Sequence, residues 1–321
     1  MNSSTSQRLQ VACVVVFYMF SALVVRLLVL YLCDHFLTSL DGLCFRNKAV
    51  LNSSPEIPLT FLLLQLLMAV GLLRVSAAIW PNKITIPATD GQVAEKLLPV
   101  VSVNIIGLVF NTLCLRDVEA SFFQIARGLV LPLTIIVSSC YTKATTSRLV
   151  LCSAATVTLG FMLGVVPSSS LPVHAIPSSL SLFYGVLSSL FIALHSVLIK
   201  NSLPFCNNST IELAWWTNAG SSLLILPFVV LTGEPSKLYT LAQKNDWSWS
   251  VFLWGTFVTG LFGFLLCVAG LLSIKITSPI THMFSSAARS VLQTVLGVRI
   301  FHDSLTANRT ISIFVILCGT M

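Results

Sequence analysis

Long apolar stretches, separated by short polar segments, recur along the whole chain. Each comes close to the roughly 20 residues that an α-helix needs to cross a bilayer. Nine such spans are predicted at 11–33, 58–80, 97–115, 119–141, 147–166, 179–200, 211–232, 249–273 and 278–300, and a shorter tenth begins near Arg309. Turn-forming residues separate them, as in the Ser/Pro-rich connector 167–177. The pattern predicts an all-α, polytopic membrane protein with about ten transmembrane helices and no soluble domain.

The composition supports a membrane protein and excludes several functions. The chain is 55% hydrophobic and 9% charged, against about 25% charged residues in soluble domains. The net charge of +7 is dispersed, so nucleic acid is not an expected partner. Nine cysteines lie scattered without a C-x-x-C pair, which favours apolar side chains over metal ligands or disulfides. Nucleophile-elbow, metalloprotease and Walker motifs are absent from the sequence, so we expect no enzyme, cofactor or metal.

A weak internal repeat divides the predicted spans into two groups of five. Arg127 is followed 21 residues later by Arg148, and Arg289 is followed 20 residues later by Arg309. Because five is odd, two five-helix halves have opposite orientations in the membrane. The sequence therefore predicts inverted halves at 1–166 and 167–321, with a substrate site between them near the midplane. Chance similarity of two Leu/Val-rich stretches is the alternative.

The ninth predicted span carries one polar stripe. His282, Ser286, Arg289 and Gln293 follow one another at steps of four, three and four residues, which places them on one helical face. A deep arginine is costly in lipid, so we interpret this stripe as one wall of an anion-binding cavity. His282 could couple transport to protons or only form hydrogen bonds within the bundle. Ser285 and Ser286 would admit either a ligand or a neighbouring helix.

Arg127 is the second deep cation, within the run FFQIAR at 122–127. Gln124 lies three residues earlier, on the same side of the helix. An arginine suits a phosphate because its planar fork can donate two parallel hydrogen bonds. Instead of binding a phosphate, Arg127 could form an ion pair with an acid of another span, such as Asp117, Glu119 or Glu212. These acids are too few to neutralise the deep cations, which favours anion binding.

Two further groups of polar and aromatic residues are candidates for ligand contact. Trp216 and Asn218 could stack on a purine and bind its edge. Aromatic side chains near a helix end also form interfacial belts, and this alternative is favoured for Trp215. Asn104 and Asn111 are seven residues apart and share a helical face, where they could contact a ligand or bridge helices.

Several motifs resemble those of the GDP-fucose transporters, in the nucleotide-sugar and triose-phosphate transporter group of the drug/metabolite transporter superfamily. The resemblance covers most of the chain. It rests on FNTLCL at 110–115, FFQIAR at 122–127, KATTS at 143–147, TSPITH at 277–282 and QTVL at 293–296. It implies ten helices in inverted halves, residence in the Golgi membrane, and exchange of a cytosolic nucleotide sugar for a lumenal nucleoside monophosphate.

The resemblance also implies which residues bind the nucleotide. A Phe-Tyr-Asn-Asn motif that recognises guanine maps onto residues 215–218, where only the final Asn218 is retained. A run of small residues ending in Lys maps onto 285–289, where Arg289 replaces the lysine. The expected substrate-binding residues are Arg127, Arg289, Asn218, Trp216, Thr217, Ser285, Ser286, Ala287, Ala288, Asn111, Gln124 and His282.

Orientation, partners and rival functions complete the expectations. A small excess of Lys and Arg on one side favours cytosolic termini, and Arg74 is expected to reach the membrane interface. The expected partners are a nucleotide sugar such as GDP-fucose, a nucleoside monophosphate such as GMP, membrane lipids and a second copy in a homodimer. Residence in the ER membrane is the alternative to the Golgi. The rival functions are carriage of another nucleotide sugar or a phosphorylated sugar, and a transport-inactive membrane scaffold.

Overall fold

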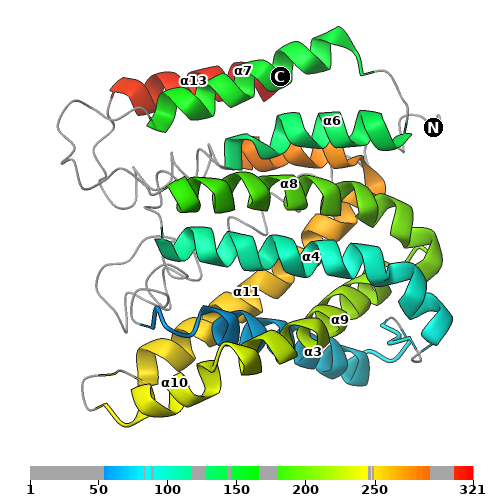
Figure 1. The fold of residues 1–321 in the computed structure, drawn as a ribbon. Coiled ribbons are helices and arrows are strands. Elements are labelled where there is room, and N and C mark those ends of the chain that lie inside the picture. Colours follow the sequence, from blue (N-terminus) through cyan, green and yellow to red (C-terminus); the bar gives the residue numbers. More distant parts are fainter. Residues whose placement is uncertain are drawn as a thin grey trace.

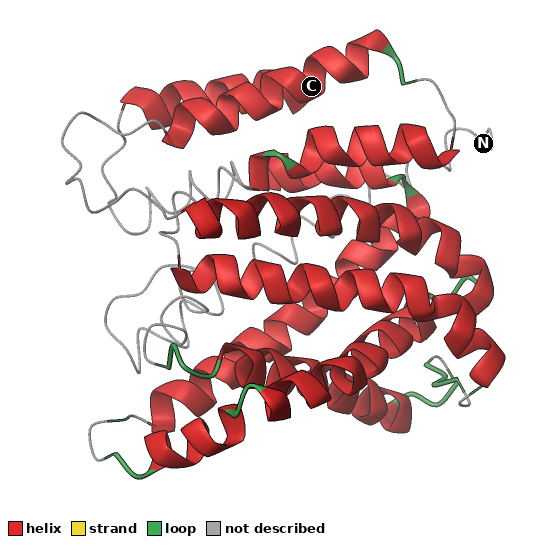
Figure 2. Ribbon diagram, in the orientation of Figure 1, coloured by secondary structure: helices red, strands yellow, loops and turns green. Residues whose placement is uncertain are grey.

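The apolar segments fold into helices wherever the computed structural model describes the chain, and no strand occurs among those residues (Figures 1 and 2). The described residues are 54–82, 84–87, 90–117, 127–142, 146–165, 179–244, 247, 249–289 and 307–320. The helices are α3 (Pro58–Ile79), α4 (Gly91–Asp117), α6 (Val130–Thr142), α7 (Arg148–Val165), α8 (Ser179–Ser202), α9 (Thr210–Leu231), α10 (Glu234–Ala242), α11 (Trp249–Ile276) and α13 (Ala307–Thr320), with the 3-10 helix η2 (Leu203–Cys206). Residues 279–289 are also helical.

The predicted spans that fall on described residues are confirmed as helices. Five helices, α3, α4, α8, α9 and α11, are long and apolar enough to cross a membrane, and α6, α7 and α13 are shorter apolar helices. The predicted span 11–33, residues 119–126 of the fourth span and residues 290–300 of the ninth span lie outside the described residues. Ten spans in two inverted halves therefore stay a prediction.

One boundary differs from the sequence prediction, and one helix was not predicted. Helix α4 begins at Gly91 rather than at residue 97, and it includes Pro99. The Asp90 carboxylate accepts a hydrogen bond from the backbone N–H of Gln92 at 2.9 Å, so a side-chain cap starts the helix before its apolar part. The segment between the predicted spans 211–232 and 249–273 contains the helix α10, for which the sequence analysis gave no prediction. Gly233 adopts the left-handed backbone conformation at the N-cap of this helix, and Glu234 and Pro235 are its first residues.

The distribution of residues on α9 is the reverse of that in a soluble protein. Its buried face includes the polar residues Thr217, Asn218 and Ser221. Its outward face is apolar, with Leu223 at 71% and Leu231 at 80% exposure. A helix that is apolar on its outer face and polar within is suited to lipid rather than to water. The helical bundle is therefore built to lie in a membrane.

Helices far apart in the sequence pack along each other. The most extensive pairings are α4 with α8 and α7 with α13, followed by α3 with α9. Helices α7 and α13 approach closely because Gly160 has no side chain: a Cβ there would lie 3.0 Å from the backbone N of Ile316. Ser312 Oγ also donates a hydrogen bond to the Gly160 carbonyl at 2.6 Å. Small residues thus allow the close approach on which helix packing in lipid depends.

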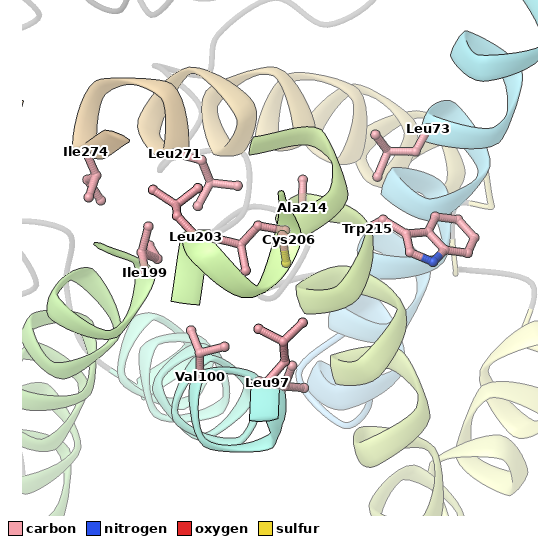
Figure 3. Packing of buried hydrophobic residues seen from close by; sticks show 12 residues of the cluster. Leu73, Leu97, Val100, Ile199, Leu203, Cys206, Ala214, Trp215, Leu271 and Ile274 are labelled. Atoms are coloured by element: carbon pink, nitrogen blue, oxygen red, sulfur yellow. The ribbon is translucent and has the colours of Figure 1, made fainter. Parts of the chain in front are cut away.

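A cluster of buried residues, here called the end cluster, closes one end of the bundle. It lies where α3, α8 and α11 end and where α4 and α9 begin. Figure 3 shows Leu203 and Cys206 of η2 between residues of α11 and α4. The end cluster consists of Leu73, Leu97, Val100, Val101, Ile199, Leu203, Cys206, Leu213, Ala214, Trp215, Leu271 and Ile274.

Candidate functional site

The predicted polar stripe lies on the helical segment 279–289, directly after α11. Ser278 precedes this segment and caps it, since its Oγ accepts a hydrogen bond from the backbone N–H of Thr281 at 3.1 Å. Further along, Arg289 Nη2 donates a hydrogen bond to Ser286 Oγ at 3.2 Å. The predicted neighbourhood of Ser286 and Arg289 is therefore confirmed, while Gln293 lies outside the described residues.

His282 of the stripe and the neighbouring small residues lie against protein. His282 is buried, and its ring lies against α11, where a Cβ placed on Gly270 would be 3.6 Å from His282 Cε1. Ser285 is also buried, and its hydroxyl donates to the Thr281 carbonyl of its own helix at 3.0 Å. Ala287 is buried and Ala288 is half-buried. The small residues of this segment are thus used for helix packing in the described structure.

Arg127 lies at the start of the described helical stretch that leads into α6. Its side chain is exposed, whereas the neighbouring Gly128 is buried, and a Cβ on Gly128 would lie 2.8 Å from Phe161 Cβ of α7. Gln124, the predicted companion of Arg127, falls outside the described residues.

One hydrophobic cluster joins the two arginine-bearing helices, and we call it the arginine-helix cluster. Its buried residues are Val130, Leu131, Ile135, Ala154, Val157, Met283, Ala287 and Ile316. They come from α6, α7, the segment 279–289 and α13. In Figure 1 the orange segment 279–289 runs beside α6 in the opposite direction. The start of α6 and the end of the segment therefore lie toward the same end of the bundle.

The predicted base-recognition residues lie near the start of α9. Thr217 and Asn218 are buried, and their side chains donate to the carbonyls of Leu213 (2.8 Å) and Ala214 (2.7 Å) in the same helix. Asn218 also interacts with the thiol of Cys267 in α11. Trp216 is half-buried and packs against the end cluster.

Trp215 departs from the interpretation favoured by sequence. It is 9% exposed and belongs to the end cluster, so it is not an outward-facing belt residue. The guanidinium of Arg74 lies over its ring, 5.2 Å from the centroid. Arg74 is exposed, and its reach to the membrane interface stays a prediction. The cation and the ring attract each other through the quadrupole of the indole, so Arg74 also connects α3 to α9.

The two asparagines of α4 bridge helices. Asn104 Nδ2 donates a hydrogen bond to Ser221 Oγ of α9 at 3.1 Å, and Ser188 Oγ of α8 donates to Asn111 Oδ1 at 3.4 Å. The helix-bridging alternative is thus confirmed for Asn104. Asn111 bonds to α8, whereas Asn104 bonds to α9. The two asparagines, seven residues apart on α4, therefore contact different helices.

Sequence reasoning missed two charged residues that hold helix ends. Glu234 is buried, and its carboxylate accepts hydrogen bonds from the backbone N–H groups of Leu59 and Thr60 at the start of α3. Lys200, near the end of α8, donates to three backbone carbonyls around the end of α11. The sequence signals were an acid next to the Gly233 break and a lysine in the last turn of a helix.

A sequence model of the Triose-phosphate Transporter family matches residues 25–321. This chain belongs to the Triose-phosphate Transporter family. Family members are transporters rather than enzymes, which confirms both the predicted resemblance and the expectation that the chain is no enzyme.

The chain is similar to several proteins that are named as transporters. It is 31% identical over 227 residues to "GDP-fucose transporter 1" of Dictyostelium discoideum, covering 71% of this chain and 59% of the relative. It is 28% identical to "GDP-fucose transporter, Golgi" of Drosophila melanogaster, covering 87% of this chain and 82% of the relative. It is also 34% identical over 228 residues to an uncharacterized transporter of Schizosaccharomyces pombe, covering 71% of this chain and 57% of that relative. The alignments thus span 59% of the Dictyostelium relative and 66% of the "GDP-fucose transporter 1" of Nematostella vectensis.

A solved crystal structure shares the fold of this family member. It superposes with a TM-score of 0.62 at 13% sequence identity, covering 96% of this chain and 94% of the other. At this identity the likeness shows the arrangement of the helices and nothing about the ligand.

Proposed function

We propose that this chain forms an antiporter that carries a nucleotide sugar, GDP-fucose, into the Golgi lumen in exchange for GMP. The observation that carries the proposal is the arginine-helix cluster, which packs α6, next to Arg127, against the helical segment 279–289 that contains Arg289. Several relatives are named GDP-fucose transporters, which favours this cargo. The Drosophila relative carries the word Golgi in its name, which favours that membrane.

The helix pairings support two inverted halves, 1–166 and 167–321. A repeat of five helices would relate α3 to α9, α4 to α11 and α7 to α13. Helices α3 and α9 pack together, as do α7 and α13, which is how equivalent helices meet on a twofold axis. The contact of α4 with α9 would be equivalent to that of α11 with α3, and an interhelical hydrogen bond is present in each. These bonds are Asn104 to Ser221 and Gln65 to Thr259, at 3.1 and 2.8 Å.

In such a carrier the two arginines bind the diphosphate from opposite halves. Each guanidinium can donate two parallel hydrogen bonds to phosphate oxygens. Trp216 and Asn218 contribute to the base pocket from α9, and His282, Ser285 and Ser286 lie on the arginine side. Asn218 must exchange its bond to the Ala214 carbonyl, 2.7 Å long here, for a bond to the base when the ligand binds. Obligate exchange follows because the cationic site is costly to reorient without a phosphate-bearing ligand.

Counterflow in proteoliposomes tests this function. Vesicles preloaded with GMP should take up labelled GDP-fucose faster than empty vesicles, and Arg289→Gln should abolish the stimulation. Arg148→Gln is the matched control, because it removes the same charge from an exposed position at the start of α7. A lack of GMP stimulation in the wild-type protein refutes the proposal.

A ligand panel separates the proposed cargo from its rivals. GDP-fucose and GMP should raise the unfolding temperature of the purified protein, because a ligand of the native state stabilises it. Stabilisation by UDP, CMP or triose phosphates instead assigns another cargo. Stabilisation by none of them favours a transport-inactive scaffold. Size-exclusion chromatography with light scattering tests the expected homodimer.

A further inference from the structure

A bend separates α11 from the segment 279–289, which contains the described part of the polar stripe. Helix α11 ends at Ile276, and Pro279 begins the next helical segment after only two residues. Proline has no N–H to continue the hydrogen bonding of α11, so the last carbonyls of that helix need other donors. His282 donates its backbone N–H to the Ser278 carbonyl at 2.9 Å, so the new helix begins at once.

Lys200 supplies donors to these carbonyls from a different helix. Its ammonium donates to the carbonyls of Ile274 (3.2 Å), Lys275 (2.6 Å) and Thr277 (3.0 Å). These bonds match the three N–H donors of a lysine ammonium. The positive charge also lies at the C-terminal ends of α8 and α11, where two helix dipoles favour a cation.

The bend lies beside buried residues of the end cluster, while the Lys200 side chain itself is exposed. The preceding Ile199 and the nearby Leu203, Leu271 and Ile274 belong to the end cluster. Ser273 in α11 is also fully buried at this end of the bundle. Lys200 therefore attaches the bend to a well-packed end of the bundle.

We propose that Lys200 is a positioning residue for the substrate site: by holding the carbonyls of the bend, it sets the direction of the helix that carries Ser286 and Arg289. This inference rests on the proposed function, in which the polar stripe with Arg289 binds the phosphate groups. Thr277, the last residue held by Lys200, lies two residues before the first helical residue, Pro279. A change of angle at the bend is amplified along the segment to Arg289.

Two measurements on the full chain test the role of Lys200. Hydrogen–deuterium exchange is measured over peptides covering residues 277–289 in the purified protein, which needs no ligand. Labelled GDP-fucose uptake into GMP-loaded vesicles gives KM and kcat. The variants are Lys200→Met, Lys200→Arg and Lys96→Met. Lys96 is the matched control, because its ammonium lies at the same end of the bundle, 5.6 Å from the centroid of the Phe205 ring.

We expect Lys200→Met to speed exchange in residues 281–286 by about tenfold and to raise KM for GDP-fucose by about tenfold, or about 1.4 kcal/mol. The kcat should stay within about twofold, since the charged groups of the site itself are intact. Lys200→Arg should restore most of the affinity, because a guanidinium also donates to several carbonyls. Lys96→Met should change neither quantity.

The outcomes separate this inference from the proposed function. Unchanged exchange in Lys200→Met overturns the inference. Faster exchange with unchanged KM also overturns it, because Lys200 would then be a structural cap only. Equal effects in Lys96→Met assign the result to general electrostatics and overturn it too. A wild-type protein that neither binds nor transports GDP-fucose refutes the proposed function, whatever the exchange shows, and removes the basis for the inference.

Discussion

Replacing Glu234 should destabilise the protein through a helix 175 residues away in the sequence. The start of α3 has no side-chain cap of its own, since Ile57 occupies the N-cap position and Pro58 follows it. Leu59 and Thr60 donate their N–H groups to Glu234 Oε1 at 3.1 Å and Oε2 at 2.6 Å. These are the groups that an N-cap residue would normally satisfy. Glu234 therefore acts as the cap of α3.

The size of the effect follows from this geometry. A hydrogen bond to a charged group contributes about 1.5–3 kcal/mol, and Glu234 is only 2% exposed, so water replaces it poorly. With the lower value for each of its two bonds, Glu234→Ala should cost about 3 kcal/mol. Glu234→Gln keeps one neutral acceptor and should cost about half as much. At about 2–4 °C per kcal/mol, the unfolding temperature should fall by about 6 °C or more for the alanine variant.

Thermal unfolding in detergent, followed with a thiol-reactive dye, measures this loss. Cys114 is fully buried in a cluster with Leu241 of α10, so its thiol becomes reactive when α10 and α3 separate. Glu56→Gln is the control, because this exposed acid lies two residues before α3 and makes no described bond to it. A Glu234→Ala protein that unfolds within about 2 °C of wild type would falsify the capping role, as would an equal loss in Glu56→Gln.

Three further predictions concern helix packing and the site. Gly160→Val should destabilise the pairing of α7 and α13 by about 1–3 kcal/mol in thermal unfolding. Gly71→Val is the control and should not destabilise the protein, because a Cβ at Gly71 has no atom within 4 Å. Equal losses of stability in the two variants would contradict this prediction. A double-mutant cycle replacing Asn104 and Ser221 by Ala should give a coupling of about 0.6 kcal/mol, and zero coupling would exclude their bond. Arg289→Lys should raise KM for GDP-fucose by about three- to tenfold, and an unchanged KM would exclude paired phosphate hydrogen bonds.

The candidate site was only partly readable from the sequence. The step of three between Ser286 and Arg289 fixed their contact, because a helix places residues three apart on one face. The amide of Asn218 donates to the Ala214 carbonyl of its own helix at 2.7 Å, a bond that the sequence analysis did not predict. The acceptor that a buried amide uses depends on which groups of neighbouring helices lie near it, and only the tertiary structure determines these groups. The sequence favours an aromatic belt for Trp215, because it does not show how α9 is rotated about its axis. That rotation decides whether the ring contacts lipid or Arg74.

By itself the sequence determined the class of the protein. Apolar stretches of spanning length left no choice but helices in a membrane, because only a helix satisfies every backbone group of one segment in lipid. Only the tertiary structure decided which helices meet and how their ends are satisfied. Glu234 and Lys200 look like ordinary loop and helix-end charges in the sequence, and they act on α3 and α11. Hydropathy reports the preference of one segment for lipid, whereas a cap from a distant residue depends on the positions of two segments at once.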